Sequence, residues 1–464
     1  MVFSSLTFLF IFLPAVLLFY FLLPGIKTKN AVLCLFSLVF YAWGEPVYIL
    51  LMLASILLNY LIGLGMERFP RRKKMLLLLA LVFNLGAIGY FKYAGFFLSS
   101  LNSLFSLHLP VLQIALPIGI SFYTFQILSY VIDVYHGRTA VQKNLLSLAT
   151  YITMFPQLVA GPIVRYETVR DELSRRKVTL NDFTAGLCRF FFGLGKKVLI
   201  ANQMALTADA VFNAAALPPA GALWIGALCY AMQIYYDFSG YSDMAIGMGR
   251  MFGFHFMENF DYPYIADSVT DFWRRWHISL STWFREYVYI PLGGNRCSPA
   301  RHIFNMLVVW LLTGLWHGAA WTFVLWGLYY GLLLILEKYV LGGVLNRIPK
   351  AVRRIITFLL ALFGWIIFRS ESPAALGRFL SGAFLFGSSG TGAFLMSTAN
   401  ALSPLILLPV AVLGCLPWTR RLAKRFPDSG VLPVLRLVCA FFVWLASIAM
   451  LLGESYNPFI YFRF

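Results

Sequence analysis

The sequence predicts an all-α protein that crosses a membrane many times, and three observations support this prediction. The chain has 464 residues, of which 60% are hydrophobic and only 12% are charged, whereas soluble domains carry about 25% charged residues. Its mean hydropathy is +0.77. Apolar stretches near the ~20 residues that a helix needs to cross a bilayer recur along the chain. No separate soluble domain is visible, so we expect residues 1–464 to form one membrane-embedded domain.

The apolar stretches predict about eleven transmembrane helices plus re-entrant or interfacial helices. The expected spans are 3–23, 31–44, 47–66, 75–93, 115–135, 144–163, 183–203, 221–250, 301–317, 320–341, 352–369, 403–417 and 433–453. The first span lacks the features of a cleaved signal peptide, so we expect it to be retained. Pro156 and Gly161-Pro162 interrupt 144–163, and broken pieces of this kind are tolerated where they are buried in protein or line a cavity.

The net charge of +18 is explained by basic residues in short loops, the arrangement that sets membrane topology. We therefore expect contact with membrane lipid and no nucleic-acid partner. Lys27 and Lys29 follow the first span, and five basic residues lie within 68–74. If both loops are cytoplasmic, the N-terminus and the turn at Glu45 lie outside. This pattern predicts a multi-pass membrane protein, and we expect it in the plasma (inner) membrane.

Two histidines are the candidates for acid/base chemistry. His317 lies in the uncharged stretch Leu311–Trp326. An ionisable side chain at membrane depth is costly and usually faces a protein interior or a wet cavity, and imidazole exchanges a proton near neutral pH. His277 follows Asp271-Phe-Trp-Arg-Arg-Trp. We therefore expect chemistry at or within the membrane.

Residues 271–296 mix tryptophans, arginines and His277. One interpretation is an aromatic and basic belt at the membrane interface. The other is that the arginines hold anionic groups of a donor molecule, although some of them would then compete with pairing to Asp271 or Glu286. Both interpretations remain open. The candidate donor-binding or tunnel residues are Arg274, Arg275, Arg285, Arg296, Asn295, Trp276 and Trp316.

Asp237 and Asp243 place two carboxylates in an apolar helix and complete this set of candidates. Residues six apart do not share a helix face, because neighbours on a face are three or four apart. A metal pair is therefore not expected, and each aspartate has either a structural or a catalytic partner elsewhere. The six cysteines form no Cys-x-x-Cys pair, so the sequence predicts no metal site.

Three segments carry a resemblance to a known family: Trp273-Arg-Arg-Trp-His-Ile-Ser-Leu-Ser-Thr-Trp, Pro291-Leu-Gly-Gly-Asn-Arg and Thr313-Gly-Leu-Trp-His-Gly-Ala-Ala-Trp. They resemble motifs of the membrane-bound O-acyltransferases. The similarity is to the bacterial branch that includes the alginate O-acetylation membrane protein and the peptidoglycan O-acetyltransferase membrane component. Shorter segments at 117–123, 160–163, 236–245 and 457–462 also fit, so the resemblance covers nearly the whole chain.

The resemblance implies a funnel-like helical fold with a central tunnel. The hallmark histidine of the family matches His317, and its second active-site position matches His277. The implied reaction moves an acyl group, which we expect to be acetyl, from a cytoplasmic thioester donor to an extracytoplasmic polysaccharide. The donor is acetyl-CoA or an acyl carrier protein, and no bound cofactor is expected. Relatives in this branch favour a relay through an extracytoplasmic SGNH-type acetyltransferase partner.

In this scheme we expect His317 to act as general base or as first acyl acceptor, and His277 to steady the carbonyl oxygen. The alternatives are a D-alanyl or lipid acyltransferase of the same family, or a non-catalytic transporter or flippase. Broken helices and intramembrane ionisable groups also occur in transporters. Internal repeats would favour a transporter, and the sequence shows none.

Overall fold

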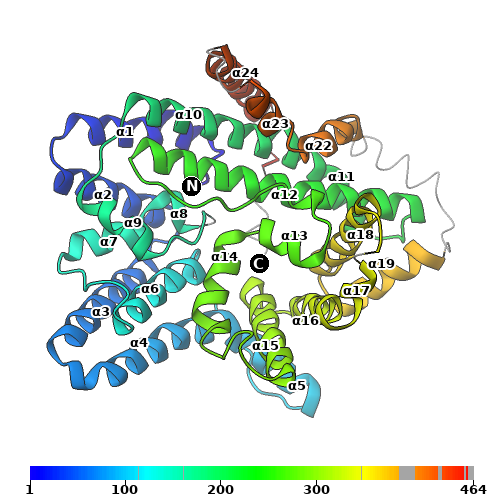
Figure 1. The fold of residues 1–464 in the computed structure, drawn as a ribbon, viewed down its shortest axis with the longest axis horizontal. Helices are drawn as coiled ribbons and strands as arrows, with labels where there is room; N and C mark the ends of the chain where they lie inside the picture. The colour runs from blue at the N-terminus through cyan, green and yellow to red at the C-terminus, as the bar shows by residue number, and fades with distance from the viewer. Residues whose placement is uncertain are drawn as a thin grey trace. The chain divides into compact units, whose positions relative to one another are not determined.

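The computed structural model describes residues 1–112, 114–159, 161–345, 347–385, 403–426, 431–453 and 456–457. These residues form helices, turns and irregular segments, with no strand among them (Figure 1). They divide into two compact units. Unit 1 comprises Met1–Phe190 and Ser242–Met257, and unit 2 comprises Phe191–Tyr241 and Glu258–Phe464. The prediction of an all-α fold is confirmed.

Unit 1 contains the N-terminal helices, and α10 and α12 contribute residues to both units. Its elements are η1 (Phe8–Phe12), α1 (Leu13–Leu22), α2 (Ile26–Gly44), α3 (Ile49–Arg68), η2 (Pro70–Arg72), α4 (Lys73–Ile88), η3 (Gly89–Tyr93), α5 (Ala94–Phe105), α6 (Ile120–Tyr135), α7 (Leu145–Thr153), α8 (Phe155–Leu158), α9 (Tyr166–Ser174) and α10 (Leu180–Gly195). The interruption expected near Pro156 is confirmed, since α7 and the four-residue α8 replace one long span.

Buried polar contacts join distant segments of unit 1. The Tyr20 hydroxyl donates to the Phe252 carbonyl at 2.6 Å. Arg176 donates from Nε to the Tyr20 oxygen at 2.9 Å and from Nη1 to Asn30 Oδ1 at 2.6 Å. Helix α6 begins later than expected, at Ile120, because Gly119 before it adopts a left-handed conformation (φ 75°), which glycine populates easily.

The two candidate histidines, His277 and His317, lie in unit 2. Its elements are η4 (Lys196–Ala201), α11 (Asn202–Phe212), α12 (Ala220–Met251), η5 (Pro263–Ile265), α13 (Val269–Arg275), α14 (Ile278–Phe284), η6 (Arg285–Tyr289), α15 (Pro299–His317), α16 (Trp321–Leu336), η7 (Glu337–Leu341), α17 (Gly342–Leu345), α18 (Lys350–Arg369), α19 (Pro373–Leu385), η8 (Ser403–Leu407), α22 (Leu408–Gly414), α23 (Trp418–Arg425) and α24 (Val431–Gly453).

The core of unit 2 is aromatic. Trp276 packs against Trp365 with ring centroids 4.6 Å apart, and Trp273 packs against Trp326 at 5.4 Å. At the end of α18, Arg369 donates to Asp209 Oδ1 at 2.9 Å and to Asn213 Oδ1 at 3.0 Å on the α11 side. This buried arginine is thus neutralised and hydrogen-bonded, as a buried charge requires.

Five helical stretches within the described residues are long and apolar enough to cross a membrane. They are Ile49–Arg68, Pro70–Phe105, Trp321–Leu345, Lys350–Arg369 and Val431–Gly453. The prediction of a chain with many apolar helices is confirmed, while the number of crossings, about eleven by length, stays a prediction. So does the single domain over 1–464. The expected segment 403–417 is divided between η8 and α22. Residues 387–392, whose glycines and serines predict a small turn, lie outside the described residues.

The charge asymmetry predicts that the loop at Arg72 is cytoplasmic and that the Glu45 turn is extracytoplasmic. Cysteines introduced one at a time at Arg72 and Val47, both exposed, test this topology. The background carries Cys297→Ser and Cys439→Ser, because the other native cysteines are buried. An impermeant maleimide is expected to label Val47→Cys in intact cells and Arg72→Cys only after permeabilisation. The reverse pattern contradicts the topology.

Candidate active site

His317 is the last residue of α15 and is 8% exposed. Its imidazole packs against the rings of Trp316 at 5.0 Å, Trp326 at 5.1 Å and Phe368 at 5.1 Å between centroids. The helix begins at the Ser298 cap, whose hydroxyl accepts from the Arg301 amide at 3.4 Å, and Pro299 follows in the first turn. It ends at His317 because Gly318 is extended. The histidine is therefore held at a helix end inside an aromatic enclosure.

Glycines bring α15 and α16 into close contact, and the two helices lie side by side (Figure 1). A Cβ added at Gly314 would lie 2.3 Å from the Phe323 carbonyl oxygen, and one added at Gly327 would lie 2.4 Å from the Trp310 carbonyl oxygen. A Cβ at Gly318 would lie 2.2 Å from the Phe323 ring. Any side chain at these positions would push the helices apart. The glycines around His317 thus set its distance from Trp326.

His277 lies between α13 and α14 and is 1% exposed. Its backbone is left-handed (φ 46°, ψ 53°), a conformation that costs a non-glycine residue roughly 1–2 kcal/mol. The chain before α13 holds it there by two backbone hydrogen bonds: the Ile278 amide donates to the Asn259 carbonyl at 3.0 Å, and the Asp261 amide donates to the Arg275 carbonyl at 3.0 Å. Residues 259–261 therefore clamp the turn that carries His277.

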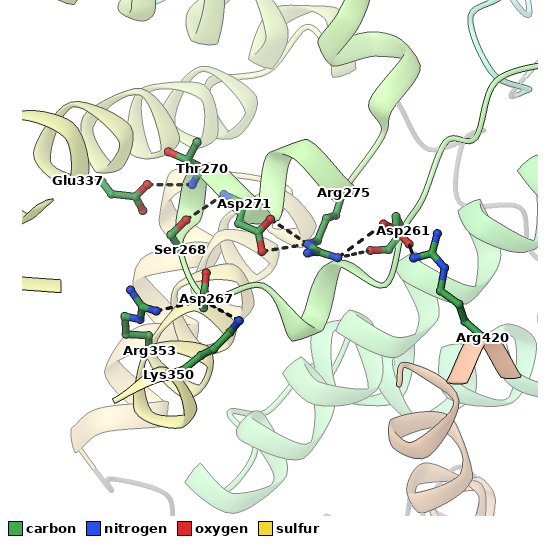
Figure 2. Close-up of polar contacts among 10 residues, drawn as sticks. All are labelled: Asp261, Asp267, Ser268, Thr270, Asp271, Arg275, Glu337, Lys350, Arg353 and Arg420. Atoms are coloured by element: carbon green, nitrogen blue, oxygen red, sulfur yellow. Dashed lines mark hydrogen bonds and ion pairs between the residues drawn. The ribbon is translucent and has the colours of Figure 1, made fainter. Parts of the chain in front are cut away.

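Charged groups fix the helix that leads to His277 (Figure 2). Arg275 Nε lies 3.0 Å and 2.9 Å from the two Asp271 oxygens. Its Nη1 donates to the Asp261 carbonyl at 3.2 Å, and Arg420 pairs with the Asp261 carboxylate at 2.9 Å. The loop at Asp261 and the end of α13 are thus joined by side-chain as well as backbone contacts.

The start of α13 is held in the same way (Figure 2). Glu337 accepts hydrogen bonds from the Val269 amide at 2.7 Å and the Thr270 amide at 3.1 Å, and the Ser268 hydroxyl accepts from the Asp271 amide at 3.0 Å. Carboxylates are favourable at this helix end because its free amides carry partial positive charge. Next to Ser268, Asp267 pairs with Arg353 at 3.1 Å and Lys350 at 3.7 Å.

Trp316 is a common neighbour of the two histidines. Its ring lies 5.8 Å from that of His277 and 5.0 Å from that of His317. Phe238 packs edge-on against His277 at 4.6 Å. His277 lies outside the five apolar helical stretches. Its burial lowers the pKa of the imidazole to about 3, because a charged ring is poorly solvated in the protein interior. His277 is therefore neutral near pH 7.

The two aspartates of α12 have basic partners. Asp237 pairs with Lys197 at 2.8 Å, and both side chains are buried. Asp243 lies in unit 1, where its Oδ1 accepts from Arg189 Nε at 2.9 Å and Nη2 at 2.8 Å. The described residues contain no group of three His, Cys, Asp or Glu side chains that fits a metal ion.

The remaining candidates differ in their surroundings. Arg274, Arg285, Arg296 and Asn295 are exposed, and Arg285 lies 3.3 Å from Glu286. Arg275 is half-buried and occupied by Asp271 and Asp261. Trp276 is 3% exposed and belongs to the aromatic core, whereas Trp316 contacts both histidines.

Sequence reasoning missed Asn259, which is 1% exposed and contacts His277 directly. No sequence signal could have found it, because Asn259 lies 18 residues before His277 and no motif surrounds it. The two residues come together only because the chain folds back on itself. Sequence reasoning also missed Phe238, which lies on α12 beside the predicted Asp237.

Comparison with known proteins is consistent with this geometry. The model of the membrane-bound O-acyltransferase family matches residues 138–372, which include Asn259, His277 and His317. The chain is 41% identical over 501 residues to the probable alginate O-acetylase of Azotobacter vinelandii, with 100% of both chains covered. It is 35% identical to the peptidoglycan O-acetyltransferase of Helicobacter pylori, covering 82% of this chain and 79% of that one. The teichoic acid D-alanyltransferase of Bacillus subtilis is 30% identical, covering 55% and 69%.

The contacts of Arg275 predict a structural effect that its neighbour Arg274 does not share. Arg275→Ala leaves Asp271 without its partner and weakens the clamp at Asp261. Because these groups are partly exposed, we expect a loss of about 1–2 kcal/mol in stability. Thermal unfolding in detergent measures the loss. Arg274→Ala, which removes an exposed arginine from the same helix, is the control. Equal decreases in unfolding temperature for the two variants contradict the role of the clamp.

Proposed function

The chain belongs to the membrane-bound O-acyltransferase family, and on this premise we propose that it moves an acetyl group from a cytoplasmic thioester to a hydroxyl of an extracytoplasmic polysaccharide. Its membership makes it an acyltransferase with apolar, membrane-type helices. The alignment with the alginate relative over the full length of both chains supports acetyl as the group transferred and a polysaccharide as the acceptor. We further propose that it lies in the plasma (inner) membrane.

The observation that carries this proposal is the gathering of two buried histidines about Trp316. Buried ionisable groups in a membrane protein are expensive and usually serve a function. Both histidines have aromatic neighbours, and such surroundings exclude water, which would otherwise hydrolyse a thioester. A structural role alone does not explain two imidazoles in one enclosure.

The reaction requires a group that accepts a proton and a group that acts at the thioester. The acceptor oxygen attacks the carbonyl carbon, a C–O bond forms, the C–S bond breaks, and the hydroxyl proton ends on the departing thiolate sulfur. We assign these two tasks to His277 and His317. A well-placed general base contributes typically ~10²–10⁴ in rate.

The donor we propose is acetyl-CoA or an acetylated acyl carrier protein, which reaches the histidines from the cytoplasm. Both carriers are anionic, and guanidinium groups match phosphate and carboxylate geometry. Arg274, Arg285 and Arg296 are exposed to solvent, although Arg285 also pairs with Glu286. Arg275 is less accessible, because it is half-buried and paired with Asp271.

We propose that an extracytoplasmic SGNH-type acetyltransferase receives the acetyl group and passes it to the glycan. Support comes from the similarity to the relatives named for O-acetylation of alginate and peptidoglycan, the branch in which a relay of this kind is expected. Direct transfer to a sugar hydroxyl is the alternative acceptor route.

A D-alanyl group is the second candidate cargo. The Bacillus subtilis relative named for that transfer is similar over 55% of this chain. Partial coverage of this kind favours acetyl, because the relatives named for acetylation are similar over 82% and 100% of it.

His317→Ala is expected to lower acetyl transfer at least about 100-fold, since it removes one of the two histidines to which we assign the chemistry. Transfer of radiolabelled acetyl from the donor to cell-envelope glycan measures the effect. The matched control is His302→Ala on the same helix. His302 is buried and lies 2.7 Å from both the Tyr289 and Tyr339 hydroxyls, so its loss should affect stability more than turnover. Full activity in a well-folded His317→Ala protein rules out the assignment.

Single Arg→Gln changes at 274, 285 and 296 test the donor route. A residue that binds only the donor ground state raises the donor KM and leaves kcat nearly unchanged. We expect this result for at least one of the three. Arg347→Gln, at another exposed arginine, controls for the loss of net charge. If all three leave the donor KM unchanged and alter dependence on the acceptor, the arginines serve the acceptor side.

A further inference from the structure

We propose that Asn259 is a positioning residue that holds the His277 imidazole with its proton on Nδ1, so that Nε2 accepts a hydrogen bond from the acceptor hydroxyl. This inference rests on the proposed acyl transfer and assigns one of its two tasks to His277. The side chains of Asn259 and His277 are in contact, and each residue is 1% exposed.

The identity of the Asn259 atom that faces His277 follows from its other partner. The Ser279 backbone amide lies 3.2 Å from this atom. A backbone N–H can only donate, so the atom must be the amide oxygen Oδ1 and not the NH₂ group. The Ser279 hydroxyl, at 2.9 Å, donates to the same oxygen.

The tautomer of His277 follows in turn. Its Nδ1 lies 3.1 Å from Asn259 Oδ1. Two acceptors cannot form a hydrogen bond, so Nδ1 carries the hydrogen and donates it. The Ser279 hydroxyl is 3.5 Å from Nδ1 and is better placed for Oδ1. In the neutral ring the lone pair is therefore on Nε2.

Nε2 is buried and has no hydrogen-bond partner within the described part of the protein. Within the described residues, the hydrogen-bond and ring partners of His277 are Asn259, Ser279, Phe238 and Trp316, and none of these carries a charge. A buried acceptor without a partner is unfavourable. A substrate hydroxyl that donates to Nε2 would satisfy it.

This arrangement changes the task we expect of His277. A lone pair on Nε2 cannot donate to the thioester carbonyl oxygen, so neutral His277 does not steady that oxygen. It instead orients the hydroxyl and accepts its proton as the C–O bond forms. The proton then passes to the thiolate released when the C–S bond breaks. His317 is left to act at the thioester.

The fold around His277 is expected to survive replacement of the Asn259 side chain, because the backbone carbonyl of Asn259 still accepts from the Ile278 amide. Asn259→Ala removes the acceptor for Nδ1–H and should lower kcat about 10–100-fold, by analogy with the loss of the partner that orients a metal-binding histidine. The donor KM should change little. Asn84→Ala, at a buried asparagine of α4 that bonds Asn59 at 2.9 Å, controls for loss of a buried amide.

Asn259→Asp separates positioning from simple packing. The carboxylate keeps an acceptor for Nδ1–H, so activity at high pH should be largely rescued. Its negative charge favours the imidazolium form, which has no lone pair to offer. The acidic limb of the rate profile should therefore move to higher pH than in the native enzyme. A variant as inactive as Asn259→Ala at every pH overturns the inference.

A direct measurement does not depend on activity. The chain has six histidines, so ¹⁵N-histidine NMR of the full protein in detergent, with His277→Gln for assignment, reports which ring nitrogen carries hydrogen. We expect a protonated Nδ1 and a bare Nε2 in the native protein, and a mixture in Asn259→Ala. A native spectrum with hydrogen on Nε2 overturns the inference. The expected spectrum in a protein that transfers no acetyl group overturns the proposed function instead.

Discussion

The clamp between residues 259–261 and the turn at His277 is the interaction on which the candidate site depends. Backbone hydrogen bonds from Ile278 to Asn259 and from Asp261 to Arg275 hold the turn from both sides. Without them, the left-handed backbone of His277 (φ 46°) would relax, since such strain persists only where the surroundings impose it. The ring would then lose its contacts with Phe238 and Trp316.

The charges near this clamp show how an apolar protein keeps ionisable groups without destabilising itself. Asp271, Asp261, Asp267 and Glu337 each accept from a cation or a helix amide (Figure 2). Deeper in unit 2, Asp237 is neutralised by Lys197. Among these acidic groups every charge is matched, so they hold the scaffold in place. His277 differs because it is neutral and keeps an unmatched lone pair.

Much of this fold was predictable because apolar length is a strong signal in membrane proteins. The expected span 221–250 is helix α12 (Ala220–Met251), and 301–317 is α15 (Pro299–His317). Proline at 156 was enough to predict the break between α7 and α8. Boundaries were less predictable where backbone conformation decides them, as at Gly119 before α6.

The site was predictable only in part. Both histidines could be predicted as site residues, because they are ionisable residues in apolar or aromatic sequence surroundings. The two short motifs that contain them also indicate a functional site. The pairing of Arg275 with Asp271 follows from their i, i+4 spacing on a helix. Asn259 could not be found in this way. Its role depends on a contact over 18 residues of irregular chain, and no periodicity records such a contact.

The tautomer of His277 depends on local backbone, packing and hydrogen bonding together. A helix end places His317 among aromatic rings, and a strained turn places His277 beside the same tryptophan. Those rings carry no charge, and the hydrogen bond that His277 Nδ1 makes to the Asn259 side chain sets the tautomer of the imidazole. Burial keeps the ring neutral, and Asn259 decides which nitrogen carries the hydrogen. An uncharged asparagine suits this purpose better than a carboxylate would, because a negative charge would draw a second proton onto the ring and remove the lone pair on which proton acceptance depends.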